Sequence, residues 1–464
     1  MRHAIAAAAA CTLLLVGCRS GEKRAGPTPA PAPSGSVSGS GVPTPSAAPS
    51  TADTDWTTYH HDNSRAGVAP ALAPVGPLSR AWRADLDGPV YGQPLVVGDR
   101  VFAATENNTV YGLDAATGKV VWSVHMGTPI PGAKLACGNI DPLGITSTMV
   151  YDPATKLVFA LAELSDASHV LVSVDAATGA VRERRPAEPP KGDRVAHQQR
   201  SALNLWNNRI YIAYGGLAGD CGRYFGSVVA LPTTGTAAPI SYTIPTSREG
   251  GIWAPGGGTV AGGRLLYAVG NGESTSGRYD GSDSVIALTA DLQLVDRFAP
   301  RTWADDNSND LDLGSMTPAV VGDYVYADGK RGVGYALRLA NLGGIGGEVA
   351  QAYVCPAFGG AAVSANTIFV PCTDGPRAVT VDGAGKISVG WHAPVRAKGS
   401  PVVGGGAVWV VDYDAGELYA LDPASGNVVQ HIAVGEAPHF ASPTLARDRA
   451  YVGTKSGVVA VAGA

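Results

Sequence analysis

The sequence predicts an all-β fold, an eight-bladed β-propeller of four-stranded antiparallel blades, from three observations. Short β-branched strands alternate with turns rich in Gly, Pro, Asn and Asp. One strand-and-turn pattern recurs about every 40–60 residues, which is the period of propeller blades rather than of helical repeats. No stretch shows a sustained 3.6-residue apolar period, so little helix is expected.

The composition supports this class and excludes others. The 464 residues include 61 glycines and 33 prolines, only 16% are charged and 45% are hydrophobic. A coiled coil would be richer in Glu, Lys and Leu, and a wholly disordered chain would have less to bury. The net charge of −5 comes without a basic stripe, so no nucleic-acid partner is expected.

The repeat is clearest near the start of the folded region. Residues 93–102 (QPLVVGDRVF) give its first half and residues 109–122 (TVYGLDAATGKVVW) its second half. One half or the other recurs at residues 172–179, 228–235, 285–289, 317–326, 400–404, 418–426 and 442–445. At about 50 residues for each blade, residues 56–464 have room for eight blades.

The two ends of this region are predicted to share one blade. The last copy, residues 449–461, stops after its third strand. Residues 78–83 (LSRAWR) match the outer strand at residues 120–122 and can supply the missing one. Closing the ring in this way removes an exposed sheet edge.

The first 18 residues have the features of a secretory signal. Arg2 and His3 precede an apolar run of 13 residues, 4–16, which is short for a membrane span. The run ends in LVGC, which resembles the lipobox of bacterial lipoproteins and predicts lipidation of Cys18. Ordinary secretion with Cys18 as a bystander is the alternative.

Residues 19–55 are rich in Pro, Ala, Ser, Gly and Thr and predict a disordered tether before the propeller at 56–464. No further apolar stretch reaches spanning length, so the membrane is expected to be a partner only through the lipid anchor. The sequence therefore predicts a monomer on the extracytoplasmic face of a bacterial cell membrane.

Four cysteines remain in the predicted propeller: Cys137, Cys221, Cys355 and Cys372. An even number in an exported domain predicts two disulfides, with three alternative pairings. None stands in a CxxC or CxxCH spacing, so covalent haem and structural zinc are not expected.

The blade pattern resembles the pyrroloquinoline-quinone repeat, and the whole body resembles the eight-bladed quinoprotein alcohol dehydrogenase-like propeller. Residues 56–67 (WTTYHHDNSRAG) are similar to the start of such domains. The family contains dehydrogenases and also non-enzymatic outer-membrane assembly lipoproteins. The fold alone therefore does not decide the function.

The resemblance assigns residues to a quinone site. Residues 250–253 (GGIW) are similar to the segment whose Trp lies under the quinone ring, which points to Trp253. Lys330 matches a lysine that contacts the quinone carbonyls. Arg200, in a polar cluster before a strand, is a third cofactor-binding candidate. Inter-blade packing for Trp253 and a surface position for Lys330 and Arg200 are the alternatives.

The resemblance also implies a calcium ion and a catalytic base. Asn271, in YAVGNG, matches a calcium-binding Asn, with Asp312 as a further ligand and Asp220 as a substitute for a missing Glu. Residues 305–315 (DDNSNDLDLGS) resemble the acidic element of polyvinyl-alcohol-dehydrogenase-like chains. They offer Asp310 or Asp306 as the base that accepts an alcohol proton. A turn at Asn271 and a solvated acidic loop are the alternatives.

The adjacent Cys–Cys pair of many such enzymes is absent. Cys137 and Cys221 fall in segments that border the cofactor in the family, so a disulfide between them is a hypothesis. Cys355 and Cys372 lie on successive strands of one expected blade and are expected to pair locally.

Two functions follow from the sequence. One is a lipid-anchored, pyrroloquinoline quinone- and calcium-dependent oxidoreductase acting on a small alcohol or polyol. The other is a non-catalytic propeller that binds proteins or cell-envelope polymers.

Overall fold

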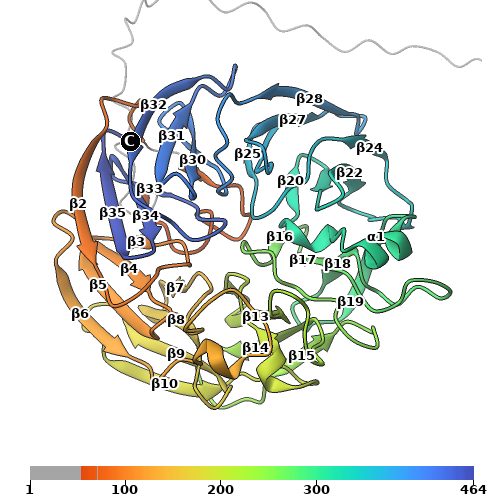
Figure 1. The fold of residues 1–464 in the computed structure, drawn as a ribbon, viewed down its shortest axis with the longest axis horizontal. Coiled ribbons are helices and arrows are strands. Elements are labelled where there is room, and N and C mark those ends of the chain that lie inside the picture. The colour runs from red at the N-terminus through yellow and green to blue at the C-terminus, as the bar shows by residue number, and fades with distance from the viewer. Residues whose placement is uncertain (1–53, 70–71) are drawn as a thin grey trace, which may run out of the picture. The chain divides into compact units, whose positions relative to one another are not determined.

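The computed structural model describes residues 54–69 and 72–464. Eight sheets are arranged around a central axis (Figure 1), which confirms the predicted propeller. The predicted signal peptide, the lipidated Cys18 and nearly all of the predicted tether lie outside the described residues.

Blades 1 to 4 follow one another along the chain, and neighbouring strands within each are antiparallel. From the hub outward their strands are β3 (Leu95–Val97), β4 (Arg100–Ala104), β5 (Thr109–Asp114) and β6 (Val120–His125); β7 (Val150–Asp152), β8 (Leu157–Glu163), β9 (His169–Asp175) and β10 (Val181–Pro186); β12 (Asn204–Trp206), β13 (Arg209–Gly216), β14 (Ser227–Pro232) and β15 (Ile240–Thr243); β16 (Thr259–Ala261), β17 (Arg264–Val269), β18 (Ser284–Leu288) and β19 (Leu294–Ala299).

Blades 5 to 8 have the same arrangement. Their strands are β20 (Ala319–Val321), β21 (Tyr324–Ala327), β22 (Val333–Arg338) and β24 (Ala350–Tyr353); β25 (Ala362–Ser364), β26 (Thr367–Val370), β27 (Arg377–Val381) and β28 (Ile387–His392); β29 (Val402–Gly404), β30 (Ala407–Asp412), β31 (Glu417–Leu421) and β32 (Val428–Ala433); β33 (Thr444–Ala446), β34 (Arg449–Thr454), β35 (Gly457–Ala462) and β2 (Ser79–Asp85).

A few short elements lie outside this pattern. They are β1 (Val68–Ala69), which pairs with β29; β11 (His197–Gln198), which pairs with β13; β23 (Gly344–Ile345), which pairs with β19; the helix α1 (Trp303–Asn309); and the 3-10 turns η2 (Gly132–Lys134), η3 (Arg194–Ala196) and η4 (Leu313–Ser315). Among the described residues, no helix has the length and apolar character that a membrane span requires.

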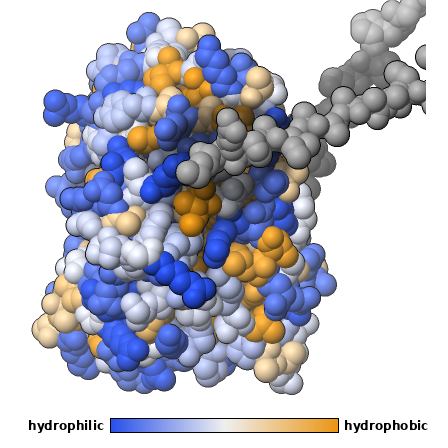
Figure 2. All heavy atoms as spheres, turned by 90° about the vertical axis from the view of Figure 1, so that its right-hand side faces the viewer, coloured by the Kyte–Doolittle hydropathy of each residue, from blue (hydrophilic) through white to orange (hydrophobic). Residues whose placement is uncertain are grey.

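Strand burial follows from the stacking of blades. The third strands β14 and β18 are buried almost throughout, because sheets cover both of their faces. The outer strands β6 and β32 instead expose every other side chain or more. Figure 2 shows the outer side of the ring that lies to the right in Figure 1, where apolar side chains form separate groups among polar ones.

Tryptophans on outer strands join some neighbouring blades. Trp82 of blade 8 donates from its indole Nε1 to the carbonyl of Ala115 in blade 1 at 3.0 Å, and its ring covers Gly118. Gly118 has a φ of +72°, and a Cβ there would overlap the ring, so only glycine fits. The same contact joins Trp122 to Gly179 and Trp391 to Gly426.

The ring closes as predicted. β2 pairs antiparallel with β35, with Trp82 opposite Ala460. The first part of the propeller therefore completes the sheet made by its last part, and blade 8 has four strands.

Residues 56–69, which we call the strap, run along the inner strands of the ring. The backbone of Trp56, Thr57, Asn63, Ala66 and Gly67 makes hydrogen bonds of 2.6–3.0 Å to the inner strands of blades 1, 2, 4, 6 and 7 in turn. The strap thereby ties together five blades that are far apart in the sequence.

Candidate functional site

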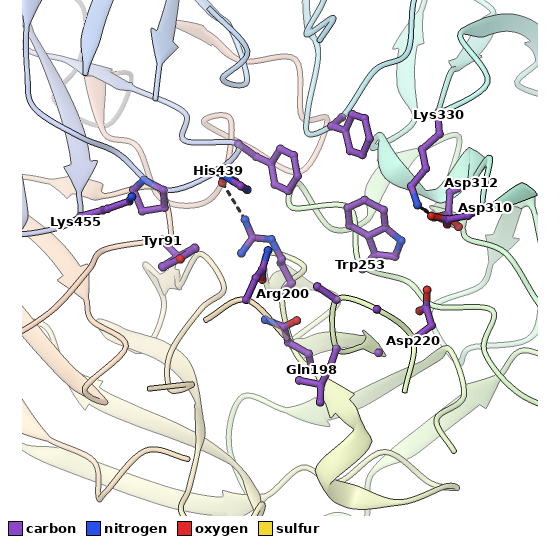
Figure 3. A pocket seen from close by; sticks show the side chains of 18 residues that line it. Tyr91, Gln198, Arg200, Asp220, Trp253, Asp310, Asp312, Lys330, His439 and Lys455 are labelled. Carbon is purple, nitrogen blue, oxygen red and sulfur yellow. Dashed lines mark hydrogen bonds and ion pairs between the residues drawn. The ribbon is translucent and has the colours of Figure 1, made fainter. Parts of the chain in front are cut away.

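A cavity of about 380 Å³ lies at the hub (Figure 3). Its walls come from connections between blades and from turns between second and third strands, so segments distant in sequence meet there. The cavity-lining residues include six of the eight side chains predicted to bind cofactor or metal or to act as base: Arg200, Asp220, Trp253, Asp310, Asp312 and Lys330.

One side of the cavity holds two carboxylates and a lysine. Nζ of Lys330 lies 2.5 Å from Oδ1 of Asp310 and 2.6 Å from Oδ2 of Asp312. Asp310 is 63% exposed, whereas Asp312 is 3% exposed. Burial raises the pKa of Asp312, although Lys330 opposes that shift. Burial acts to lower the pKa of Lys330, but the charge of Asp312 outweighs it and raises the pKa.

Local structure explains how this group is positioned. Asp310 ends α1 in a left-handed conformation, with φ +53° and ψ +47°. That conformation stops the helix and turns the chain back towards the hub. Lys330 comes from the turn between β21 and β22, and its backbone N–H donates to the carbonyl of Asp312 at 2.8 Å. The two segments therefore hold each other in register.

Trp253 lies against this group. Nζ of Lys330 is 5.8 Å from the centre of the indole ring, within cation–π range. Ser201 Oγ is 3.0 Å from each of the carbonyl oxygens of Ile252 and Ala254, which flank the tryptophan. These contacts hold the backbone on both sides of Trp253 and so position its indole ring.

Arg200 occupies the other side of the cavity. Its guanidinium lies 5.2 Å from the ring centre of Tyr91 and 5.1 Å from that of Phe440, and it donates to the carbonyl of His439 at 2.9 Å. Its Nε is buried without a hydrogen-bond partner. Among the described residues, no carboxylate forms an ion pair with Arg200. Burial lowers its pKa.

Asn271 and Asp306 are not among the cavity-lining residues. The backbone N–H of Asn271 donates to Oδ1 of Asp312, and its carbonyl accepts from Gly250. Asp306 lies on α1, where it pairs with Arg331 and accepts from the hydroxyl of Thr302. Neither residue therefore borders the cavity, although Asn271 contacts Asp312, which does.

Asp220 reaches the cavity from the turn after β13, and Tyr224 donates its hydroxyl to Oδ1 of Asp220 at 2.5 Å. Of the predicted calcium ligands, Asp220 and Asp312 line the cavity, whereas Asn271 does not. Within the described part of the chain, no set of three His, Cys, Asp or Glu side chains is arranged to hold a metal ion. Both oxygens of Asp312 already contact Lys330 and the N–H of Asn271.

The expected disulfides are present. Cys137 is joined to Cys221, and Cys355 to Cys372. The second pair is buried inside the core that blades 5 and 6 share. The first borders the cavity, because both of its cysteines lie close to cavity-lining residues in the sequence.

Sequence reasoning missed the aromatic part of the hub. Phe358 and Phe440 stack with ring centres 5.8 Å apart, and each lies 6.2–6.3 Å from the ring of Trp253. Tyr91, Arg200, Phe358 and Phe440 each stand four residues before the inner strand of their blade. This repeat position could have located them.

The fold and the site define a quinoprotein alcohol dehydrogenase-like propeller. The chain belongs to the family described as outer membrane protein assembly factor BamB, whose model matches residues 79–257 and 346–464.

Two curated relatives are polyvinylalcohol dehydrogenases. The protein of Sphingopyxis sp. (strain 113P3) is 30% identical over 295 residues, which cover 56% of this chain and 42% of that protein. The protein of Pseudomonas sp. is 25% identical over 270 residues, covering 53% and 40%. The matched part of the chain thus spans about two fifths of these relatives.

Solved structures share the fold at low identity. Quinohemoprotein alcohol dehydrogenase of Comamonas testosteroni superposes with a TM-score of 0.67 at 15% identity, covering 88% of this chain and 80% of that one. BamB of Moraxella catarrhalis gives a TM-score of 0.55 at 16% identity, with 83% and 97% covered.

Proposed function

We propose that this protein is an extracytoplasmic oxidoreductase that binds pyrroloquinoline quinone in the hub and oxidises a small alcohol or polyol. The observation that carries the proposal is the Asp310–Lys330–Asp312 group beside the face of Trp253. The polyvinylalcohol dehydrogenase relatives support the same reaction class.

The hub suits a planar, anionic cofactor. Trp253 offers an aromatic surface for a flat ring. The buried Nε of Arg200 is a donor without an acceptor, and a carboxylate of the quinone would satisfy it. Lys330 can donate to a quinone oxygen while it keeps a carboxylate contact. When bound, the quinone accepts the two electrons of the alcohol, which leaves as a carbonyl compound.

Asp310 is the better base of the two predicted candidates. Asp306 is paired with Arg331 away from the cavity, whereas Asp310 lines it and is accessible to substrate. Asp310 accepts the hydroxyl proton as the carbon gives up its hydride. Lys330 holds the carboxylate in place through its ion pair with Asp310.

No step of the proposed reaction is assigned to a metal ion. Calcium dependence stays a prediction, and the cofactor titration with and without calcium tests it. A lipid anchor at Cys18, where the predicted signal in residues 1–18 ends, would place the propeller on the outer side of the cell membrane.

The test is a titration of the purified propeller with pyrroloquinoline quinone, with and without calcium, followed by dye reduction with alcohols and polyols. We expect saturable binding and substrate-dependent reduction, both lost in Asp310→Asn combined with Lys330→Ala. Absence of quinone binding under all conditions would favour the non-catalytic scaffold.

A further inference from the structure

The connection between blades 1 and 2, from the end of β6 to the start of β7, contains a small closed loop. Residues 130–143, which we call the lid, are closed at the base by two backbone hydrogen bonds of 2.8 Å between Ile130 and Leu143. Within the loop, the N–H of Gly132 donates to Asp141 at 2.8 Å. The lid therefore has a defined neck and a compact internal structure.

The lid lies against the cavity wall. Ile130, Ile140 and Leu143 are at most 7% exposed and form a small apolar cluster with Leu217 and Tyr91, which both line the cavity. This cluster is separate from the larger cores between blades. Asn139, from the tip of the lid, also lines the cavity. Movement of the lid would therefore change the cavity itself.

Few polar contacts hold the lid down. Among the described residues, the hydrogen bond that links the lid beyond its neck to the rest of the ring runs from Lys134 Nζ to the carbonyl of Ser165, at 2.9 Å. Lys134 is exposed and Ser165 is half-buried, and an exposed contact of this kind contributes little. The remaining link is covalent, because Cys137 near the lid tip is bonded to Cys221.

The turn on the other side of this disulfide is built from left-handed backbone conformations. Gly219, Asp220 and Gly222 all have positive φ, of +97°, +52° and +79°. Glycine adopts such a conformation freely and Asp more often than most residues, so the run forms a tight turn. The disulfide at Cys221 ties this turn to the lid.

We propose that the Cys137–Cys221 disulfide pins the lid over the hub and so controls how fast ligands enter and leave the cavity. It also positions Asp220 and Asn139, one on each side of the bond, at the cavity wall. The disulfide joins two loops from different parts of the ring, the lid and the turn after β13, and together they form a rigid border of the cavity. The lid and its attachment follow from the contacts of the described residues, whereas its effect on quinone exchange rests on the proposed function.

The experiment compares the wild-type protein with the double variant Cys137→Ser/Cys221→Ser. Hydrogen exchange is measured for peptides covering residues 130–143 and 217–222, and quinone dissociation by stopped-flow displacement. We expect both peptides to exchange at least about tenfold faster in the variant, and quinone to dissociate faster by a similar factor. Exchange in β8 and β13 should stay unchanged.

The other disulfide supplies the matched control. Cys355→Ser/Cys372→Ser removes a bond buried in a different core, so the lid peptides should keep their wild-type exchange. A further variant, Lys134→Ala, removes the lid's hydrogen bond to Ser165 and should speed lid exchange less than loss of the disulfide does.

Two results would overturn the proposal. Unchanged exchange in the lid of the Cys137→Ser/Cys221→Ser variant would show that apolar packing alone holds it. Faster lid exchange with unchanged quinone dissociation would show that the lid does not limit access. If the protein binds no quinone, the proposed function fails, and hydrogen exchange still decides whether the disulfide pins the lid.

Discussion

Two parts of the ring differ in how closely they follow the blade repeat. The family pattern covers residues 79–257 and 346–464, and all three Trp–Gly contacts between blades lie in those ranges. The stretch between them, residues 258–345, which we call the site segment, contains α1, η4, Asp310, Asp312 and Lys330. Regular blades supply stability, and polar chemistry is concentrated where the repeat is interrupted.

The largest expected effect is on catalysis in the site segment. Asp310→Asn should lower kcat by about 10²–10⁴-fold, since it removes the proposed base but keeps the side-chain shape. The matched control is Asp414→Asn in blade 7, where Asp414 forms a similar exposed pair with Lys398. Steady-state dye reduction measures both, and equal losses in the two variants would contradict the assignment.

The next effect concerns the regular blades. Trp82→Ala should lower the free energy of unfolding by about 3–5 kcal/mol, because it removes a large buried side chain and its contact with the next blade. Urea titration followed by circular dichroism gives the change. Quinone affinity should stay close to wild type, and a matching loss of affinity would show that the two parts of the ring are not separable.

Variants of Arg200 test the side of the cavity opposite the site segment. Arg200→Ala should weaken quinone binding about 10–100-fold, because a charge-assisted hydrogen bond is lost in a buried setting. Calorimetry measures the Kd. Arg200→Lys should restore part of the affinity, since it keeps the charge but not the forked geometry. Wild-type affinity in Arg200→Ala would place the quinone elsewhere.

A smaller effect is shared by both parts of the ring. Burial raises the pKa of Glu106 in blade 1 to about 8 and that of Asp328 in the site segment to about 7. A folded-state pKa above the unfolded one means that the folded state holds the proton more tightly. The contribution of these two groups to stability should therefore be complete below about pH 4 and be lost as the pH rises to these values.

Glu106→Gln isolates one of these groups. The amide oxygen can still accept from Gly144 and Thr146, as Oε2 does now. Melting temperatures measured from pH 5 to 9 should fall less steeply in this variant than in wild type, and the difference should grow up to about pH 8 and then level off. Asp328→Asn should flatten the lower part of the same curve. Parallel curves for variant and wild type would exclude buried ionisation as the cause.

The sequence predicted the ring and its closure because both follow from a repeated pattern. The outer strand with Trp82 was recognisable by its likeness to the strand with Trp122, and β2 completes blade 8. The helix near residues 305–312 was harder to predict, because α1 has only seven residues and its sequence is rich in Asp and Asn, which have low helix propensity. Tertiary contacts of Asp306 with Arg331 stabilise it.

The site was predictable as a set of positions but not in its side-chain directions. Trp253 and Lys330 were located from motifs, and both line the cavity. The motif at Asn271 was equally clear, yet its backbone rather than its side chain contacts Asp312. A motif fixes where the chain passes, whereas rotamers depend on neighbours from other blades, such as Phe440.

The strap has a consequence for the order of folding. It bonds to inner strands from β3 to β29, and β2, which follows it, pairs with β35 near residue 460. Contacts of such long sequence separation are slow to form, because the intervening chain must first be brought together. Single blades can form locally before the whole chain is available, whereas the hub that holds Trp253 and Arg200 is assembled last.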